Sequence, residues 1–326
     1  MSMNQIDILL ATYNGEAYLS EQIDSIINQS YDNWIMLIRD DGSKDGTLDI
    51  IEWYTKKYHN KIFLIKDGKK NLGVCGNFSA LLNNSRSDYV MFCDQDDVWI
   101  KDKIKITFQK MKEMENTNSP HCPILVHTDL IVVDRNLEKI SSSFWKFSHL
   151  NPVVQKTFSR LLIQNFVTGC TMMINRSLKN LSPVIPVSAM CHDWWLALVA
   201  CAFGKIESLP TPMVLYRQHQ SNEIGATSWN HFLFLINAIN LLVHKNFYAT
   251  FKEEKNQIRN VLKKIINQSK SFYAYYYEKL NKQQLRPLTF FNNIETHNFI
   301  DRRIKLLKNR IYANGFARNL KLLISV

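Results

Sequence analysis

The chain has 326 residues, and 46% of them are hydrophobic, which is enough for one large domain or for a domain with an appendage. The net charge of +11 is unevenly placed, because residues 251–326 carry 16 Lys or Arg against 5 Asp or Glu, whereas residues 1–250 carry 24 of each. The neutral main part argues against a nucleic-acid-binding core, and the basic end predicts contact with an anionic partner such as a lipid surface.

Cysteine usage and hydropathy indicate the compartment. The six cysteines show no Cys-x-x-Cys spacing and lie mostly in apolar stretches, so we expect free buried thiols in a reducing cytosol. The sequence enters a strand-like segment without a basic-then-apolar leader. No window of about 18 residues is uninterruptedly apolar, and the nearest stretch, 231–243, is short and broken by two asparagines. We therefore expect a cytoplasmic protein, free or peripheral on the inner face of the cell membrane.

The first hundred residues alternate between short apolar runs and helical spacing. Apolar runs predict strands at 6–11, 34–38, 62–65 and 89–92, and apolar residues three or four apart predict helices between them. Strands that alternate with helices predict an α/β fold with a mostly parallel sheet covered on both faces. Such sheets bind ligands at the carboxyl ends of their strands, so the polar loops after these four strands are expected to line one crevice.

Three carboxylates, Asp94, Asp96 and Asp97, follow the fourth strand. Carboxylates this close repel one another unless a cation or hydrogen-bond donors compensate. Mg²⁺ and Mn²⁺ prefer oxygen ligands and bind through one or two carboxylates together with substrate phosphates and water. We assign Asp94 and Asp96 to this chemistry. Asp97 is assigned to the cap of the next helix, which the spacing of Ile100 and Ile104 predicts.

The two familiar phosphate-binding loops are absent from the sequence. There is no Gly-x-Gly-x-x-Gly after the first strand and no Gly-x-x-x-x-Gly-Lys-Ser/Thr anywhere, so neither a dinucleotide fingerprint nor a P-loop is supported. A bound diphosphate would therefore depend on a metal ion held by Asp96.

Two later strands carry histidines. His127 and Asp129, in a strand predicted at 124–133, share one face of it. They could serve a site or could form a satisfied pair inside the sheet. His219 follows a strand predicted at 213–216, where a histidine could join a metal site.

A later helix, predicted at 192–203, opens with Asp193 and two adjacent tryptophans. The aspartate could be only a cap favoured by the helix dipole. Large amphipathic rings suit the recognition of sugars, so we expect a cavity wall here. A strand predicted at 168–175 begins with small residues. The pocket residues assigned on this basis are Trp194, Trp195 and Gly169.

The character of the sequence changes after about residue 226. Gly and Pro become rare, helical spacing dominates, and Lys and Arg crowd the other faces. The aromatic run 272–277 is typical of membrane–water interfaces, although an ordinary helical subdomain with a solvated basic face explains the same pattern. We place the boundary near Ala226. This gives an α/β domain at 1–226 and a basic helical region at 227–326, which would contact a membrane or another copy of the chain.

Four motifs occur in a fixed order at the ends of the predicted strands. They are Ala11-Thr12-Tyr13-Asn14-Gly15-Glu16, Asp40-Asp41-Gly42-Ser43 with Asp45-Gly46-Thr47, Asn71-Leu72-Gly73, and Asp94-Gln95-Asp96-Asp97-Val98-Trp99. Together they resemble the motifs of family 2 glycosyltransferases with the GT-A fold, over about residues 5–225. The aspartate motif, with 192–195 and 216–219, is most similar to bacterial rhamnosyltransferases that build surface polysaccharides.

The resemblance implies a nucleotide-sugar site in the crevice. In the family, the loop matching Thr12 and Tyr13 holds the nucleobase with the aromatic ring stacked on it, and the acid matching Asp41 hydrogen-bonds the base. The acid matching Asp94 meets the ribose, and the acid matching Asp96 binds the metal that bridges the two phosphates. The nucleotide-binding residues implied in full are Thr12, Tyr13, Asn14, Glu16, Asp41, Asn71, Gly73, Asn77 and Asp94.

The resemblance also implies a catalytic base. The family's base lies in an acid–Asp pair that opens a later helix, and the pair here is His192-Asp193, so the residue before the base departs from the commoner acid. This implies Asp193 as the base and leaves the acceptor pocket open. A histidine after the last strand often completes the metal site in relatives, so Mg²⁺ or Mn²⁺ is expected on Asp96 and His219.

The activity implied is an inverting, metal-dependent transfer of a sugar to a glycan or lipid-linked glycan in cell-surface polysaccharide synthesis. The first choice of donor is dTDP-rhamnose, and a UDP-sugar is the alternative. A nucleotidyltransferase would need a Gly-rich basic loop after the first strand, which residues 12–16 lack. A non-catalytic carbohydrate-binding or membrane-docking module would use the tryptophans and the basic end but would leave the aspartate cluster unexplained.

Overall fold

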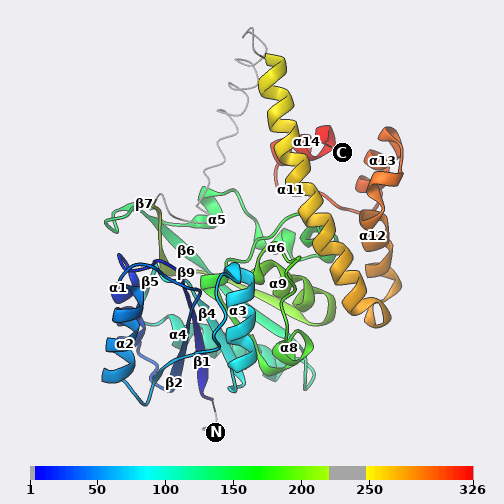
Figure 1. Cartoon of the computed structure of the whole chain (residues 1–326). Helices are drawn as coiled ribbons and strands as arrows, with labels where there is room; N and C mark the ends of the chain where they lie inside the picture. Colours follow the sequence, from blue (N-terminus) through cyan, green and yellow to red (C-terminus); the bar gives the residue numbers. More distant parts are fainter. Residues whose placement is uncertain (1–3, 220–246, 326) are drawn as a thin grey trace. The chain divides into compact units, whose positions relative to one another are not determined.

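The computed structural model describes residues 4–219 and 247–325, which form two compact units (Figure 1). The first unit takes the described residues of Met1–Phe144, Val167–Val187 and Cys191–Ala226. The second takes those of Trp145–Phe166, Ser188–Met190 and Thr227–Val326. The predicted boundary between residues 226 and 227 lies outside the described residues and stays a prediction.

Within its described residues, the first unit contains one sheet of nine strands. The strands are β1 (Ile6–Thr12), β2 (Trp34–Asp40), β3 (Ile62–Leu64), β4 (Tyr89–Cys93), β5 (Val98–Trp99), β6 (Ile124–Val133), β7 (Lys139–Ser141), β8 (Met172–Asn175) and β9 (Lys205–Arg217). Their order is β3-β2-β1-β4-β8-β6-β9-β5, with β7 paired to β6.

The direction of the strands decides which ends meet. β3, β2, β1 and β4 run parallel, as predicted, whereas the rest of the sheet is mixed, because β8 runs antiparallel to both β4 and β6. β9 is parallel to β6. β6 and β9 therefore run in the direction of β4, and the carboxyl ends of β1, β2, β4 and β9 share one edge with the beginning of β8.

Helices cover this sheet on both faces. They are α1 (Leu19–Ile27), α2 (Thr47–Lys57), α3 (Gly73–Asn84), α4 (Lys103–Thr117), α8 (Arg176–Leu181) and α9 (His192–Phe203). Right-handed crossovers place α1 and α2, which lead from β1 to β2 and from β2 to β3, on one face, and α3, which leads back to β4, on the other. α3 contacts β1, β2 and α9, and α4 contacts β6 and β8 (Figure 1).

Most predicted elements are confirmed, with differences where strands end. β6 and α9 have the predicted bounds, whereas β9 begins earlier than expected, at Lys205. The strand predicted at 168–175 begins as a 3-10 turn, η1 (Gly169–Thr171), before β8. The prediction that Asp97 caps a helix is wrong, because β5 intervenes by pairing with β9 and α4 begins only at Lys103. None of the six cysteines forms a disulfide, as predicted, but only Cys93 and Cys170 are buried, and the other four are half-buried.

The described part of the second unit is helical. It contains α5 (Phe144–Phe147, whose first residue belongs to the first unit), α6 (Pro152–Gln155), α7 (Phe158–Leu161), α11 (Phe247–Tyr276), η2 (Tyr277–Lys279), α12 (Lys282–Asn292), η3 (Ile294–Thr296), α13 (Phe299–Lys308) and α14 (Phe316–Ser325). α11 packs against α12 and α14, and α12 packs against α7.

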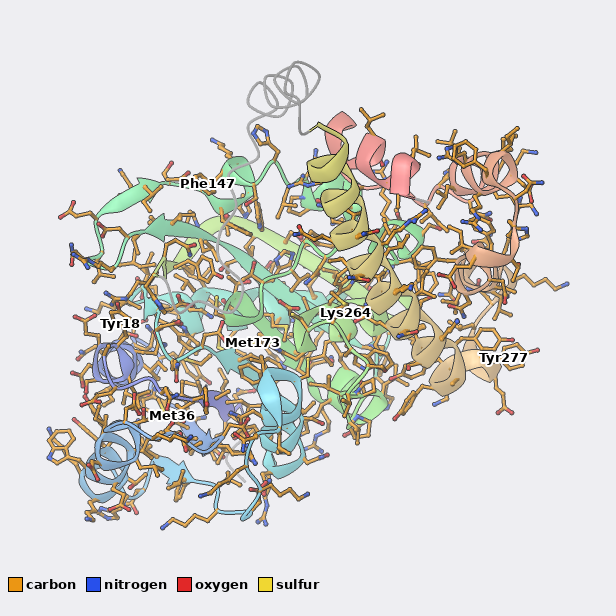
Figure 2. All side chains as sticks on the ribbon, turned by 45° about the horizontal axis from the view of Figure 1, so that its top comes forward. Tyr18, Met36, Phe147, Met173, Lys264 and Tyr277 are labelled. Carbon is orange, nitrogen blue, oxygen red and sulfur yellow. The ribbon has the colours of Figure 1, made fainter. Side chains whose placement is uncertain are left out.

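The aromatic run 272–277 is divided between the core and the surface of this unit. Phe272 is fully buried with its ring 5.5 Å from that of Phe158, and Tyr276 is also buried. Tyr275 is 55% exposed, and Tyr277, which is labelled in Figure 2, is 51% exposed. Among residues 4–219 and 247–325, no helix is long and apolar enough to cross a membrane. The apolar stretch at 231–243 lies outside the described residues.

Candidate active site

Predicted site residues from five elements meet at one edge of the sheet. Thr12 ends β1, Asp41 follows β2, Asp94 follows β4 and His219 follows β9. These four strands point the same way, and the antiparallel β8 begins at this edge just after Gly169. The crevice expected from the sequence therefore lies where parallel strands place it.

Hydrogen bonds join the loop after β1 to the loop after β2. The N–H of Asn14 donates to Ser43 Oγ at 2.8 Å, and the N–H of Gly46 donates to Glu16 Oε2 at 2.9 Å. Thr12 lies buried beneath this contact. Asn14 and Glu16, both predicted to line the nucleotide pocket, thus hold the two loops together in this structure.

Tyr13 is fixed through its backbone and presents its ring at the surface. The side-chain amide of Gln95 accepts from the Tyr13 N–H at 2.8 Å and donates to the Tyr13 carbonyl at 2.9 Å. A Cβ at position 15 would lie 2.3 Å from Gln95 Oε1, so Gly15 leaves room for the amide. The Tyr13 side chain is 48% exposed, where a planar base could stack on it. Gln95 lies within the aspartate motif, and the sequence alone predicts no role for it.

A buried arginine, Arg39, holds the start of the loop after β2. Arg39 is fully buried, and its Nη1 donates to Asp41 Oδ1 at 2.9 Å and to Asn77 Oδ1 at 3.1 Å. Its Nε donates to Asp67 Oδ2 at 3.0 Å. Burial opposes the charge, but the hydrogen bonds to Asp67 and Asp41 outweigh it and raise the pKa of Arg39. The sequence alone assigns no role to Arg39. A charged residue at the end of an apolar strand is nevertheless a signal that it could hold other side chains of the site in place.

The Asp41 carboxylate also receives the start of α3. It accepts from the N–H groups of Leu72 and Gly73, each at 2.9 Å, and the Asp41 carbonyl accepts from the N–H of Asn71 at 2.9 Å. Asn71 and Gly73 have φ of 56° and 68°, in the left-handed region that Asn and Gly tolerate best. A carboxylate has about four acceptor positions. The described bonds from Arg39, Leu72 and Gly73 use three of them, so one remains for a ligand N–H.

The end of β9 lies against the aspartate motif. His219 Nε2 lies 2.9 Å from Asp96 Oδ2, so the two predicted metal ligands are in direct contact. Arg217 donates from Nε to the Asp96 carbonyl at 2.9 Å and from its N–H to Asp97 Oδ1 at 3.2 Å. The ring of Tyr18, which precedes α1 (Figure 2), lies 4.8 Å from the His219 ring and 4.5 Å from the Arg217 guanidinium.

Asp96 and His219 fit a divalent ion. Two adjacent ligands about 2.1 Å from one octahedral ion lie about 3 Å apart, which is the separation of these two atoms. The two side chains are 16% and 11% exposed, so an ion and its substrate could reach them. One carboxylate and one imidazole leave the other positions of the ion for phosphate oxygens and water.

A second group of donors lies nearby but fits these ions poorly. Asp94, Asp97 and Cys170 offer ligand atoms within 4.8 Å of one another. Burial raises the pKa of the Cys170 thiol, and burial with the charges of Asp96 and Asp94 raises that of Asp97 well above its ordinary value. Mg²⁺ and Mn²⁺ prefer ionised oxygen ligands, so a thiol and a carboxyl that give up their protons less readily than usual suit them poorly.

Asp193 lies in the first turn of α9 and is oriented by backbone groups. Its Oδ2 accepts from the Gly169 N–H at 2.9 Å, and its Oδ1 accepts from the Trp194 N–H at 2.5 Å. The preceding His192 is buried, with its ring 3.9 Å from that of Phe78. Burial lowers the pKa of His192 to about 3, so its imidazole is neutral at physiological pH.

The two tryptophans have different surroundings. Trp195 is fully buried, and its indole N–H donates to Ser182 Oγ at 2.8 Å. Its side chain therefore belongs to the core and does not line a pocket in this structure. Trp194 is 8% exposed, and Gly169 is buried beside Asp193. Of the three residues predicted for the acceptor pocket, Gly169 and Trp194 contact the predicted base directly, each through its backbone N–H.

His127 and Asp129 are each held by a serine, which fits the alternative of a structural role inside the sheet. His127 Nε2 lies 2.8 Å from Ser208 Oγ, and Asp129 Oδ2 accepts from Ser143 Oγ at 2.5 Å. Both side chains are buried in the sheet. They therefore contribute to the fold and not to the candidate site.

Comparisons with known proteins show the family to which this mixed sheet and its aspartate motif belong. The pattern of glycosyl transferase family 2 matches residues 7–181. The dTDP-rhamnosyl transferase RfbG of Shigella flexneri is 31% identical over 240 residues, 67% of this chain and 74% of that protein. The chain belongs to glycosyl transferase family 2 and is a glycosyltransferase, as the resemblance predicted.

Further comparisons extend the family and its fold. An uncharacterized protein of Mycobacterium tuberculosis is 27% identical over 215 residues, 66% of this chain but only 59% of that protein. The structure of Staphylococcus aureus TarS 1-349 in complex with UDP-GlcNAc superposes with a TM-score of 0.54 at 17% identity, over 94% of this chain and 89% of that one. The mannosyltransferase PcManGT of Pyrobaculum calidifontis, in complex with GDP-Man and Mn²⁺, gives 0.52 at 12% identity, over 94% and 72%. These likenesses confirm the predicted GT-A fold.

Proposed function

We propose that this glycosyltransferase transfers a sugar, with inversion, from a nucleoside diphosphate donor to a hydroxyl of a glycan or lipid-linked glycan in cell-surface polysaccharide synthesis. The best candidate donor is dTDP-rhamnose, because the Shigella relative is named a dTDP-rhamnosyl transferase. A UDP-sugar is the alternative, because the similar TarS structure is a complex with UDP-GlcNAc. The observation that supports a diphosphate donor most is the 2.9 Å contact between Asp96 and His219.

The nucleotide would lie across the loops after β1, β2 and β4. The exposed Tyr13 ring suits stacking on the base, and the remaining acceptor position of Asp41 suits a base N–H. Asp94 would accept from ribose hydroxyls. Arg39 and Gln95 contact no ligand in this proposal and act by holding Asp41 and Tyr13 in place.

Asp193 would act as the general base. Its carboxylate takes the proton of the acceptor hydroxyl while that oxygen bonds to the anomeric carbon, and the bond from this carbon to the diphosphate oxygen breaks with its electron pair leaving on the diphosphate. Attack from the face opposite the leaving group inverts the configuration. The N–H groups of Gly169 and Trp194 fix the direction of the carboxylate. A Mg²⁺ or Mn²⁺ ion bound to Asp96 and His219 would supply positive charge beside the departing diphosphate.

A lipid-linked acceptor would bring the enzyme to the inner face of the cell membrane as a peripheral, cytoplasmic protein. The excess of positive charge after residue 250 supports contact with anionic lipid.

The experiment that tests this function is a thermal-shift series with dTDP, UDP and GDP, each with Mn²⁺ and with a chelator. A nucleotide at about 100 times its dissociation constant adds roughly 2.7 kcal/mol to the free energy of unfolding, which is easily seen. We expect a Mn²⁺-dependent shift that is largest with dTDP.

Variants separate the metal site from general effects on folding. Asp96→Ala and His219→Ala should lose the Mn²⁺-dependent part of the shift, while Glu52→Ala, which removes an exposed carboxylate from α2, should keep it. A larger shift with UDP would select the alternative donor. Equal shifts with Mn²⁺ and with the chelator would contradict the metal site.

A further inference from the structure

Helix α13 carries a row of large apolar side chains that no other described part of its own unit covers. Ile300, Ile304 and Leu307 are 68%, 45% and 61% exposed. At about 100° per residue, these three positions fall within one sector of about 60° of the helix. Leu306, which is buried, lies about 120° away from Ile300 on the same scale and anchors the opposite side of α13 to its unit. Exposed apolar surface of this kind marks an interaction site.

Positive charge borders the row on both sides. Arg303 lies about 40° beyond one edge of the sector and Lys308 about 40° beyond the other. Residues 297–312 contain five basic residues and a single acid, Asp301. That acid is already paired with Lys305, whose Nζ lies 2.8 Å from Asp301 Oδ2. The surroundings of the apolar row are therefore cationic.

An apolar cavity of about 220 Å³ extends this surface between α13 and α14. Leu307 belongs both to the exposed row and to the lining of the cavity, together with Ile311, Leu322 and others. A row of apolar side chains that leads into an apolar cavity suits the hydrocarbon of a lipid, whereas the flanking Arg303 and Lys308 suit its anionic headgroups.

We propose that α13 docks this enzyme onto a bilayer that contains anionic lipid. Ile300, Ile304 and Leu307 enter the boundary between headgroups and acyl chains, and Lys308, Arg310 and Arg303 contact the headgroups. Charge decides against docking through α2, which carries the exposed Trp53, because α2 has Asp49 and Glu52 as well as two lysines. The proposal rests on the proposed function only in one respect: a lipid-linked acceptor explains why the enzyme would bind a membrane.

Co-sedimentation of the full chain with vesicles, without any nucleotide, tests this docking. We expect binding to phosphatidylcholine vesicles that contain phosphatidylglycerol, and much weaker binding to phosphatidylcholine alone or at high salt. The triple variant Ile300→Ser/Ile304→Ser/Leu307→Ser should lose at least about tenfold in binding, because it removes the apolar row. Lys308→Glu should lose at least roughly fivefold, the effect of one basic residue near an anionic surface.

The control Val153→Ser removes a side chain of the same unit that is 74% exposed, and its binding should be unchanged. Circular dichroism checks that every variant is folded. Equal binding by the triple variant, or equal binding to neutral vesicles, would overturn the proposal. So would analytical ultracentrifugation that shows a dimer of the natural chain and a monomer of the triple variant, because α13 would then contact a second copy. If the docking proposal fails in this experiment, the thermal-shift test of the donor site is still valid, because it measures nucleotide binding and not membrane binding.

Discussion

The backbone N–H of Gly169 donates to Asp193 Oδ2 at 2.9 Å and thereby joins η1, the turn that leads into β8, to the first turn of α9. The imidazole of His192 fills the space beside Gly169, since a Cβ at this position would lie 2.4 Å from His192 Nε2. The direction of the Asp193 carboxylate therefore depends on a neighbour that has no side chain.

Gly169→Ala should impair catalysis more than donor binding. The added methyl group must displace His192 or the 169–171 turn, and either shift moves the N–H that orients Asp193. We expect turnover to fall about 100-fold, as small displacements of a positioned group do, with the dissociation constant of the nucleotide unchanged. Measuring turnover and nucleotide affinity on the same preparation separates the two effects.

The double variant Gly169→Ala/His192→Ala is the matched control, because the smaller side chain at 192 makes room for the methyl group. It should recover part of the lost turnover if crowding is the cause. A double variant that is no better than Gly169→Ala would show that the methyl group acts in another way.

Gln95→Ala should weaken nucleotide binding. The variant removes both hydrogen bonds that hold the backbone of Tyr13, each worth about 0.5–1.5 kcal/mol. We expect the affinity for the nucleotide to fall roughly 5- to 50-fold in isothermal titration calorimetry, because the Tyr13 ring is no longer held for stacking. Asn84→Ala removes an exposed amide of α3 and should leave the affinity as it was. An unchanged affinity for Gln95→Ala would mean that the loop needs no such support.

Lys103→Met should stabilise the protein. Lys103 is fully buried, its Nζ has no hydrogen-bond partner among the described residues, and burial lowers its pKa from 10.5 to about 8. A difference of this size corresponds to a cost of up to about 3 kcal/mol in the free energy of unfolding at neutral pH, where Lys103 is charged in both states.

The pH dependence follows from the sign of this shift. Between pH 8 and 10.5 the unfolded chain binds the proton more tightly than the folded one, so the cost declines as pH rises through this window. Urea titrations should show the advantage of Lys103→Met at pH 7 and its decline towards pH 10. An advantage that stays constant over this range would assign the gain to packing and not to charge.

The sequence predicts those parts of the fold that depend on local patterns. β1, β2, β4 and β6 are short apolar runs, and α9 has both a polar start and a glycine stop, Gly204, so these elements are predicted within one or two residues. The start of β9 was missed because its polar residues at 205–212 are held by pairing with β6, which is a tertiary contact. The same holds for β5, whose two residues form a strand only against β9.

The candidate site also contains side chains that the sequence predicted and side chains that it missed. Asp96 and His219 were predicted together from a resemblance in motif order, and they are in contact. Arg39 and Gln95 were missed because their roles depend on which buried or backbone groups they reach across the sheet, and residue spacing does not report this. Trp195 was assigned to a pocket from its residue type, but burial places it in the core.

Replacing Asp193 by asparagine tests most directly whether this carboxylate is the general base. The variant keeps the size of the side chain and can still accept from Gly169, but it cannot take a proton. Release of nucleotide from the donor found by thermal shift, with water as the acceptor, measures turnover. We expect Asp193→Asn to turn over about 10²–10⁴-fold more slowly with an unchanged Mn²⁺-dependent affinity for the nucleotide. Turnover within a few-fold of the natural protein would remove Asp193 from that role.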